Sequence, residues 1–242
     1  MVGSPRSGTT FLGRSLGSLP GFVDLGEVGP LKAAIPELAG TPPEVAADSV
    51  RRLLDVTRRL GLVGGMRAVE QTPETAFVVT AAQQAFPQAS FVHALRDGRD
   101  VVCSLLERGW LRAGRGGGDD AGLPYGPEAR FWVEAERRAE FPAASDARRA
   151  AWAWRRYVEA ARAAEARLHE VRYERLHRDR DGVARELARF LGIDPEPLRE
   201  ALGAAYGSSV GRWEDDLSAA ELEDVVAEAG PLLRELGYLQ PV

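Results

Sequence analysis

Cysteine and lysine are almost absent from this chain of 242 residues. Cys103 is the single cysteine, so no disulfide can form within the chain and no cysteine-based metal site can exist. Its position on an expected helix that faces a sheet favours a plain buried residue. Lys32 is the only lysine beside 30 arginines, a bias that suggests a GC-rich genome and removes lysine as a general catalytic option.

Long apolar runs are missing as well. No stretch could span a bilayer and no signal peptide is present, so we expect a cytoplasmic protein. The net charge of −5 argues against a large nucleic-acid interface. Because no Asp/His cluster offers a ligand set, we expect no metal. The remaining composition, 45% hydrophobic and 28% charged, suits one globular α/β domain over residues 1–242.

Strand and helix patterns alternate along the chain. Expected strands are Met1–Val2, 22–25, 90–95 and 169–172. Helices are expected from about Thr9, then over 44–60, 72–85 with Thr72 as the N-cap, 100–108, 148–166 and 182–191, and finally after Ser218, where Pro231 should kink or interrupt the helix. This order predicts an α/β three-layer sandwich, in which helices cover both faces of a central parallel sheet. Ligands of such sheets bind at the carboxyl ends of the strands.

The segment Gly3–Leu12 reads GSPRSGTTFL and has the spacing of a phosphate-binding loop between a short strand and a helix. Gly3 and Gly8 occupy the two glycine positions of G-x-x-x-x-G, and the N–H groups that open the next helix can hold a phosphate. Thr9 stands where loops that bind ATP have a lysine, and Arg6 supplies positive charge instead. The loop therefore points away from ATP and toward another phospho-anhydride.

A second motif, FVHALRDGRDVVCS over residues 91–104, has Arg96 at the end of a strand and Ser104 eight residues later on a helix. Together with PRSGTT, in this order and at this separation, it resembles sulfotransferases that use 3′-phosphoadenosine 5′-phosphosulfate (PAPS). The arginine form of the first loop is similar to the tyrosylprotein sulfotransferase branch, here in a bacterial member. The resemblance covers most of the chain, is weakest over 112–149, and implies the fold of the P-loop nucleoside triphosphate hydrolases.

The resemblance also implies where PAPS and its product 3′,5′-bisphosphoadenosine (PAP) bind. The first loop would hold the 5′-phosphate and the second motif the 3′-phosphate. VRYERL over 171–176 places a tyrosine near the adenosine, although a core tyrosine remains an alternative, and SSVGRW over 208–213 resembles a late loop that folds over the phosphates. The implied cofactor-binding residues are Ser7, Gly8, Thr9, Thr10, Arg96, Ser104, Arg108, Tyr173, Ser209 and Arg212.

Two residues are implied in catalysis. Arg6 would stabilise the charge that develops on the leaving phosphate while the sulfonyl group passes through a loose, in-line transition state. Glu27, 21 residues after Arg6 in a Gly-Glu context, would be the general base. The alternative for Glu27 is a solvated glutamate at a helix start. His93 is a rival base, although its place in the middle of an apolar strand favours a core histidine.

The sequence departs from the family pattern at two places. Gln71, in the junction EQTP, stands where the tyrosylprotein branch has a second catalytic lysine. Its amide could hydrogen-bond a sulfonyl oxygen without a full charge, or the junction could serve only as a helix cap. Only Met1 and Val2 precede Gly3, whereas the family's first strand is longer, so either the native chain starts upstream or this strand is trimmed.

The favoured function is a PAPS-dependent sulfotransferase of the EC 2.8.2 type, acting on a hydroxyl or amine of a small-molecule, lipid or glycan acceptor. A non-catalytic relative would bind PAP tightly without turnover. A P-loop kinase for a small metabolite is disfavoured by Thr9 and by the Arg96/Ser104 pair. Residues 110–145, rich in glycine and aromatic side chains, are expected to form a lid over the acceptor. A homodimer and the identity of the acceptor are left open.

Overall fold

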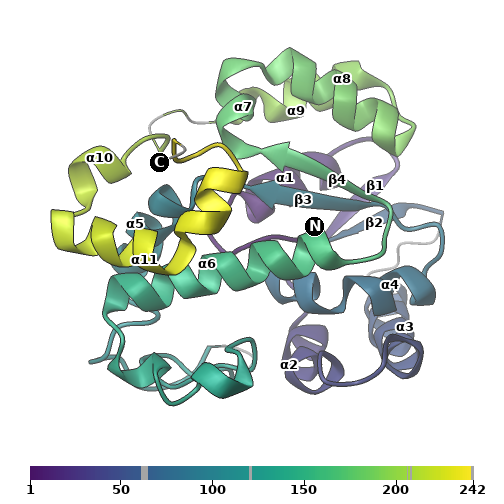
Figure 1. The fold of residues 1–242 in the computed structure, drawn as a ribbon. Helices are drawn as coiled ribbons and strands as arrows, with labels where there is room; N and C mark the ends of the chain where they lie inside the picture. The colour runs from purple at the N-terminus through teal and green to yellow at the C-terminus, as the bar shows by residue number, and fades with distance from the viewer. Residues whose placement is uncertain (61–64, 120–121, 206, 208, 241–242) are drawn as a thin grey trace.

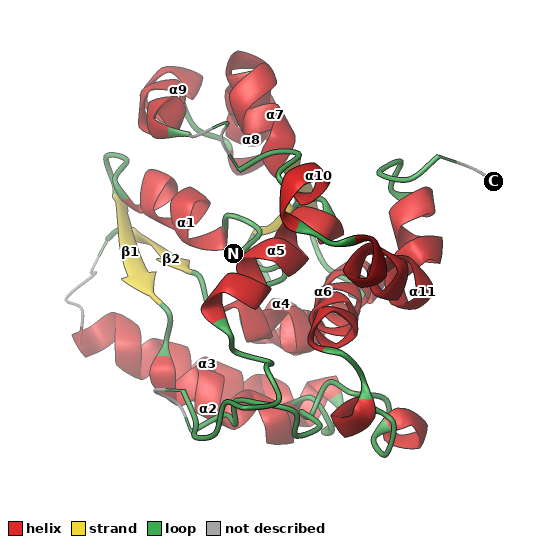
Figure 2. Ribbon diagram, turned by 90° about the vertical axis from the view of Figure 1, so that its left-hand side faces the viewer, coloured by secondary structure: helices red, strands yellow, loops and turns green. Residues whose placement is uncertain are grey.

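Helices cover both faces of parallel strands in the computed structural model (Figures 1 and 2), which describes residues 1–60, 65–119, 122–205, 207 and 209–240. The strands are β1 (Phe22–Gly26), β2 (Arg67–Glu70), β3 (Phe91–Leu95) and β4 (Leu168–Arg172). The helices are α1 (Thr9–Gly17), α2 (Gly29–Leu38), α3 (Pro43–Leu60), α4 (Val79–Ala85), α5 (Gly98–Arg108), α6 (Asp146–Ala163), α7 (Tyr173–Arg178), α8 (Arg180–Leu191), α9 (Pro195–Ala201), α10 (Trp213–Asp216) and α11 (Ala219–Glu235). Short 3₁₀ helices are η1 (Pro73–Val78), η2 (Ala135–Arg137), η3 (Phe141–Ala143) and η4 (Leu202–Ala204). The predicted α/β class is confirmed.

Within the described residues the strands form two parallel pairs, β1 with β2 and β3 with β4. Val2 connects the pairs: its N–H donates to Val92 and its carbonyl accepts from Ala94, both at 2.9 Å. The amino group of Met1 donates to the carbonyl of Glu70 at 2.5 Å. The two pairs are therefore joined at the centre by Met1, which bonds to the end of β2, and by Val2, which forms an isolated bridge with His93 of β3.

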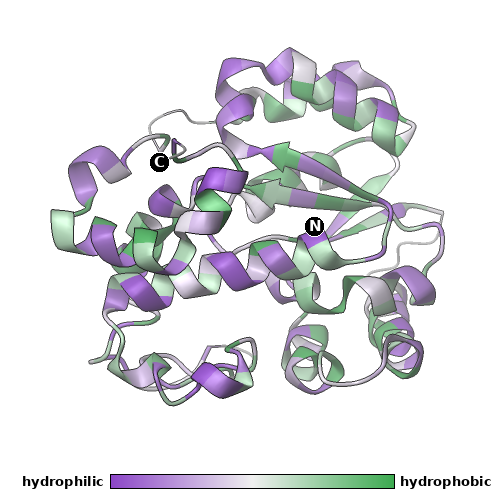
Figure 3. Cartoon of the chain, in the orientation of Figure 1, coloured by the Kyte–Doolittle hydropathy of each residue, from purple (hydrophilic) through white to green (hydrophobic). Residues whose placement is uncertain are grey.

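Alternate residues of β3 face two hydrophobic cores, as expected for a strand between two helical layers. Phe91 and Leu95 pack with residues of α2 to α6 and α11, whereas Val92 and Ala94 pack with α1, α8 and α9. The long helix α6 carries both hydrophilic and hydrophobic residues along its length (Figure 3). Among the described helices, none combines the length and the apolar character needed to cross a membrane. Cys103 is buried on α5, and burial raises the pKa of its thiol to about 12, which fits the expected inert residue.

Several predicted helix ends are confirmed. Three features differ: β2 was not among the expected strands, the interruption expected at Pro231 is absent from α11, and one expected helix is divided. Helix α8 ends at Gly192, whose φ of 67° is left-handed, and Ser218 forms a capping box at α11, which continues through Pro231 without interruption. The helix expected over 72–85 is split into η1 and α4. The hydroxyl of Thr72 does not cap it, because this hydroxyl accepts the N–H of Val28 at 2.9 Å. That bond ties the end of β1 to the end of β2.

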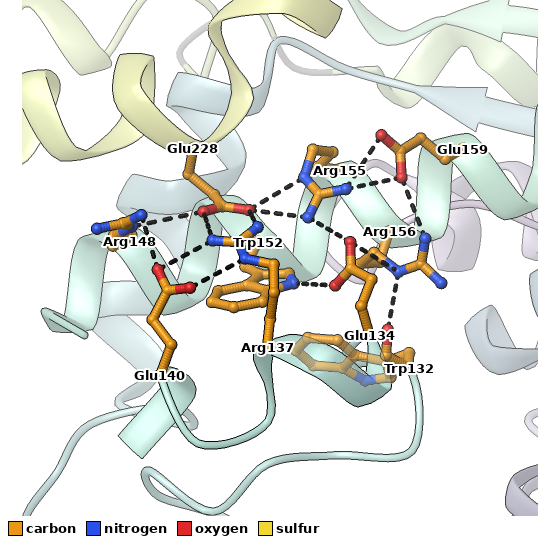
Figure 4. Close-up of polar contacts among 10 residues, drawn as sticks. All are labelled: Trp132, Glu134, Arg137, Glu140, Arg148, Trp152, Arg155, Arg156, Glu159 and Glu228. Carbon is orange, nitrogen blue, oxygen red and sulfur yellow. Dashed lines mark hydrogen bonds and ion pairs between the residues drawn. The ribbon is translucent and has the colours of Figure 1, made fainter. Parts of the chain in front are cut away.

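Residues 110–145 are fastened to α6 and α11 by a network of ion pairs (Figure 4). At its centre lies Glu228 of α11, whose side chain is 1% exposed and lies 2.8 Å from both Arg137 and Arg155. Glu134 accepts a second hydrogen bond from Arg155 at 2.7 Å. Ion pairs with α6 and α11 therefore hold the 110–145 segment in place. Its aromatic residues Trp132 and Phe141 pack in the core.

We expect Glu228→Gln to destabilise the protein by about 2–4 kcal/mol, below the usual cost of breaking a buried ion pair because the arginines are partly exposed. The substitution removes the buried negative charge that pairs with the partly exposed guanidinium groups of Arg137, Arg148 and Arg155. Urea unfolding measures the effect. Glu140→Gln is the control: Glu140 pairs with Arg137 and Arg148 but is 39% exposed, so its loss should cost less than about 1 kcal/mol. Equal losses in the two variants would contradict a central role for Glu228.

Candidate functional site

The loop Gly3–Gly8 turns sharply into the N-terminus of α1. Gly8 has a φ of 94°, and a Cβ at this position would lie 2.8 Å from Cδ2 of Tyr173, so only glycine fits. Arg6 has a φ of 72° and is the one non-glycine residue with a positive φ in the described part of the chain. Such backbone strain is concentrated at functional sites. The loop leads into a helix start, which favours an anion.

The two sequence motifs meet in space. The Nε of Arg6 donates to the hydroxyl of Ser104 at 2.9 Å, and Nη1 of Arg96 donates to the carbonyl of Arg6 at 3.1 Å. Arg96 also lies over the ring of Tyr173, 4.9 Å from its centroid, and donates to the carbonyl of Ser209. Arg96 therefore contacts the first loop, the late loop at Ser209, and Tyr173 at the end of β4.

The charge balance of this region favours an anionic ligand. The pKa of Arg6 is lowered by burial and by the neighbouring cations Arg108 and Arg96. Ser7 is buried, and its hydroxyl has no hydrogen-bond partner among the described residues. Converging cations and an unpartnered buried hydroxyl are both stabilised by a phosphate oxygen. The residues present therefore fit a phosphate group.

The late loop is fixed by Asp100 of α5. Its carboxylate accepts the N–H groups of Gly211 at 2.9 Å and Trp213 at 3.1 Å. Burial raises the pKa of Asp100, although these hydrogen bonds oppose the shift. Arg212, on the same loop, pairs with Glu107 at 3.1 Å and with a carboxylate of α10. Ser208, part of the predicted motif, lies outside the described residues.

A cavity of about 260 Å³ opens beside the first loop. Pro5 of the loop and Leu105, which follows Ser104, form the side next to the anion site. The 110–145 segment contributes the aromatic rings of Trp110, Tyr125 and Trp132. The cavity therefore lies between the predicted phosphate site and the segment predicted to be a lid.

Charged residues gather in this cavity around Lys32. Its Nζ lies 3.0 Å from Glu27 Oε2, 3.1 Å from Asp119 Oδ2 and 3.9 Å from Glu74 Oε1. Burial alone would lower the pKa of Lys32, but these carboxylates outweigh it and raise the pKa above its ordinary value. Glu74 accepts the hydroxyl of Tyr157 at 3.2 Å, and burial raises the pKa of this carboxyl. The predicted base is thus paired with the only lysine of the chain.

The model of the family described as "Sulfotransferase family" matches residues 44–197. The chain belongs to the sulfotransferase family. Its fold is similar to the sulfotransferase domain from the Synechococcus PCC 7002 olefin synthase, with 20% identity, 99% of this chain and 94% of that chain covered, and a TM-score of 0.58. The sulfotransferase domain from the curacin biosynthetic pathway matches with 14% identity, 99% and 97% coverage and a TM-score of 0.58.

Sulfotransferase STF9 from Mycobacterium avium matches more weakly, with 15% identity over 81% of this chain and 47% of that one, and a TM-score of 0.45. No curated protein matches the sequence. The two sulfotransferase domains with a TM-score of 0.58, at 20% and 14% identity, show the shared fold alone. The predicted fold and family are confirmed, and the tyrosylprotein branch stays a prediction.

The structure of this sulfotransferase brings four of the ten predicted cofactor residues together, with Arg96 at their centre. Ser104, Tyr173 and Ser209 lie around Arg6 and Arg96 through the contacts given above. The other predicted residues take different places: Gly8 packs on Tyr173, Thr9 is buried and Thr10 exposed at the start of α1, Arg108 is exposed at the end of α5, and Arg212 pairs with Glu107. Among the described residues, no group of three His, Cys, Asp or Glu is arranged to hold a metal. The roles of these residues remain predictions.

The sequence also offered Gln71 and His93 for the chemistry. Neither residue lines the cavity. The amide of Gln71 donates to both oxygens of Asp24 at 3.1 Å and packs against Gly13 of α1, so it is engaged outside the cavity. His93 is fully buried, and its Nδ1 lies 3.2 Å from Oε2 of Glu170. This environment fits the interpretation of a core histidine.

Sequence reasoning missed the partners of Glu27. Lysine was set aside as a catalytic option and stays so as a prediction, but Lys32 lines the cavity and pairs with the predicted base. Its place five residues after Glu27, on the helix that follows β1, was a usable signal. Glu74 and Asp119 carried no comparable signal, since they come from distant parts of the chain.

Proposed function

We propose that this sulfotransferase moves the sulfonyl group of PAPS to a hydroxyl or amine of a small-molecule, lipid or glycan acceptor and releases PAP. The observation that carries the proposal is the contact of Arg6 with Ser104, together with the bond from Arg96 to the Arg6 carbonyl. These bonds join the two predicted phosphate sites. They lie next to a cavity that contains Glu27, a candidate base.

One set of residues would bind the 5′-phosphate of PAPS, and a second set would bind its 3′-phosphate and adenosine. Ser7, Gly8, Thr9 and Thr10 would hold the 5′-phosphate at the N-terminus of α1, where the hydroxyl of Ser7 still needs a partner. The residues proposed for the 3′-phosphate and the adenosine are Arg96, Ser104, Arg108, Tyr173, Ser209 and Arg212. Bound PAPS supplies an activated sulfonyl group, whose transfer needs charge stabilisation and a base but no metal.

Arg6 and Glu27 would act on opposite sides of the transferred group. Arg6, which is half buried and donates to Ser104, would stabilise negative charge on the leaving phosphate. The side chain of Glu27 is 44% exposed and lines the cavity, so its carboxylate can accept the proton of an acceptor hydroxyl there. Aromatic residues of the 110–145 segment would exclude water from the acceptor once it is bound.

Incubation of the protein with PAPS and a panel of phenol, sugar and long-chain alcohol acceptors tests the proposal, with release of PAP measured by mass spectrometry. Turnover that depends on the acceptor supports a sulfotransferase. Tight PAP binding without turnover on any acceptor class would support the non-catalytic alternative. Phosphate transfer from ATP would revive the kinase alternative. Thr9 argues against it, because loops that bind ATP have a lysine at that position.

We expect Arg96→Ala to weaken PAP binding by about 10- to 100-fold, the equivalent of one charge-assisted hydrogen-bond site. The substitution removes the guanidinium that lies over Tyr173 and supports both loops. Calorimetric titration with PAP measures the loss, and thermal unfolding checks that the variant is folded. Arg14→Ala, at an exposed site on α1, should bind PAP like the parent. Unchanged affinity in a folded Arg96→Ala protein would exclude Arg96 from the cofactor site.

A further inference from the structure

Four separate parts of the chain meet at the ammonium group of Lys32. The lysine comes from α2, Glu27 from the turn after β1, Glu74 from η1 and Asp119 from the 110–145 segment. An ammonium group has three donors, and three carboxylates surround this one. The side chain of Lys32 is 17% exposed, so the cluster is largely withdrawn from water.

We propose that Lys32 is a positioning residue that holds the base Glu27 and the 110–145 segment together as one unit. The inference rests on the proposed function for the role of Glu27, but the connection itself is a property of the fold. The carboxylate of Glu27 is 44% exposed, and Lys32 restricts where its oxygens lie. Because Lys32 is already engaged by Glu27 and Asp119, it acts through them.

Asp119 uses its two carboxylate oxygens for different tasks. Oδ1 accepts the N–H of Leu123 at 2.9 Å, while Oδ2 lies 3.1 Å from Lys32. The N–H of Asp119 donates to the carbonyl of Leu123 at 2.8 Å. The backbone at Leu123 is therefore coupled through Asp119 to Lys32, and through Lys32 to Glu27.

A simple surface ion pair would not have these consequences. Exposed pairs contribute about 0–1 kcal/mol, and their removal leaves nearby backbone unchanged. The side chains of Lys32, Asp119 and Glu74 are all less than one-fifth exposed, and they come from elements far apart in sequence. Removal of the ammonium would leave three carboxylates facing one another, which repel each other and should separate the segment from the base.

Lys32→Met is expected to lower kcat by about 10²-fold, the cost of a displaced catalytic group, while PAP affinity is kept. Lys32→Arg, which keeps the charge, should recover part of the rate. In the double variant Lys32→Met/Glu27→Gln the two losses should not add, because the lysine works through the glutamate. Additive losses would show that Lys32 acts independently of Glu27 and would overturn the proposal.

Hydrogen exchange tests the connection without any turnover. The N–H of Tyr125 donates to Gly117 at 2.7 Å and that of Gly126 to Trp110 at 2.9 Å, so both amides report order in the segment. In Lys32→Met their exchange should quicken at least several-fold, while Lys32→Arg and Glu27→Gln leave it near the parent rate. Unchanged exchange in Lys32→Met would overturn the connection. If the parent protein itself binds no PAP or shows no turnover, that result would instead count against the proposed function.

Discussion

Arg6→Ala should abolish sulfonyl transfer, with a loss in kcat of about 10³-fold or more, in line with removal of one charged stabiliser from a transition state. Arg6 is held by Ser104 at 2.9 Å and shares its surroundings with two further arginines. The developing charge on the leaving phosphate is largest in the transition state, so the rate should fall much more than the affinity. Measurement of kcat with saturating PAPS, beside calorimetric PAP binding, separates the two effects.

The control for this prediction is Arg14→Ala, which removes an arginine from an exposed site on α1 and should keep full turnover. PAP affinity of Arg6→Ala should fall only modestly, by less than about tenfold, because Arg96, Arg108 and the α1 N-terminus remain. A variant that keeps the parent kcat would remove Arg6 from the chemistry. A variant that binds no PAP at all would make it a binding residue only.

Glu27→Gln should lower kcat by about 10²- to 10⁴-fold, the usual contribution of a general base, and leave PAP affinity unchanged. Glutamine has nearly the shape of glutamate and can still hydrogen-bond Lys32, but it cannot take a proton from the acceptor. The cavity that contains Glu27 lies beside the loop and not within it. Steady-state kinetics across pH, with PAP titration in parallel, provide the test.

Glu37→Gln offers a matched comparison, since Glu37 is an exposed glutamate near the end of α2 and should behave like the parent. Parent-like turnover by Glu27→Gln would transfer the base role to another group. His93 would then be tested first, although it is fully buried and lies 3.2 Å from Glu170.

The fold was largely predictable because its signals are local. The alternation of apolar runs with helical patterns located β1, β3 and β4 but not β2, and Gly192 and Ser218 marked helix ends by known capping chemistry. The split of the expected 72–85 helix was not predictable. The partner of the Thr72 hydroxyl was not predictable either, because this hydroxyl accepts the N–H of Val28 from a distant strand end in place of capping its own helix.

The anion-binding part of the site was predictable from the sequence. The residues around the cavity were predicted only in part. Glycine spacing and Arg96 carry a pattern that sequence reasoning can detect, and the bond from Arg6 to Ser104 joins the two motifs across 98 positions. The cluster around Lys32 has no such pattern, because packing of the 110–145 segment places Asp119 there. Gln71 shows the converse, since a motif position placed it near the chemistry and its contacts with Asp24 hold it outside the cavity.

Calorimetric titration of the protein with PAP, with AMP and ATP as comparison ligands, tests the central claim most directly. We expect PAP to bind at micromolar concentration or tighter, about −8 kcal/mol or better. AMP and ATP should bind at least tenfold more weakly, because Arg96 and Ser104 are proposed to recognise the 3′-phosphate that both lack. Equal binding of the three nucleotides, or no binding of PAP, would contradict the assignment of the two joined loops to this cofactor.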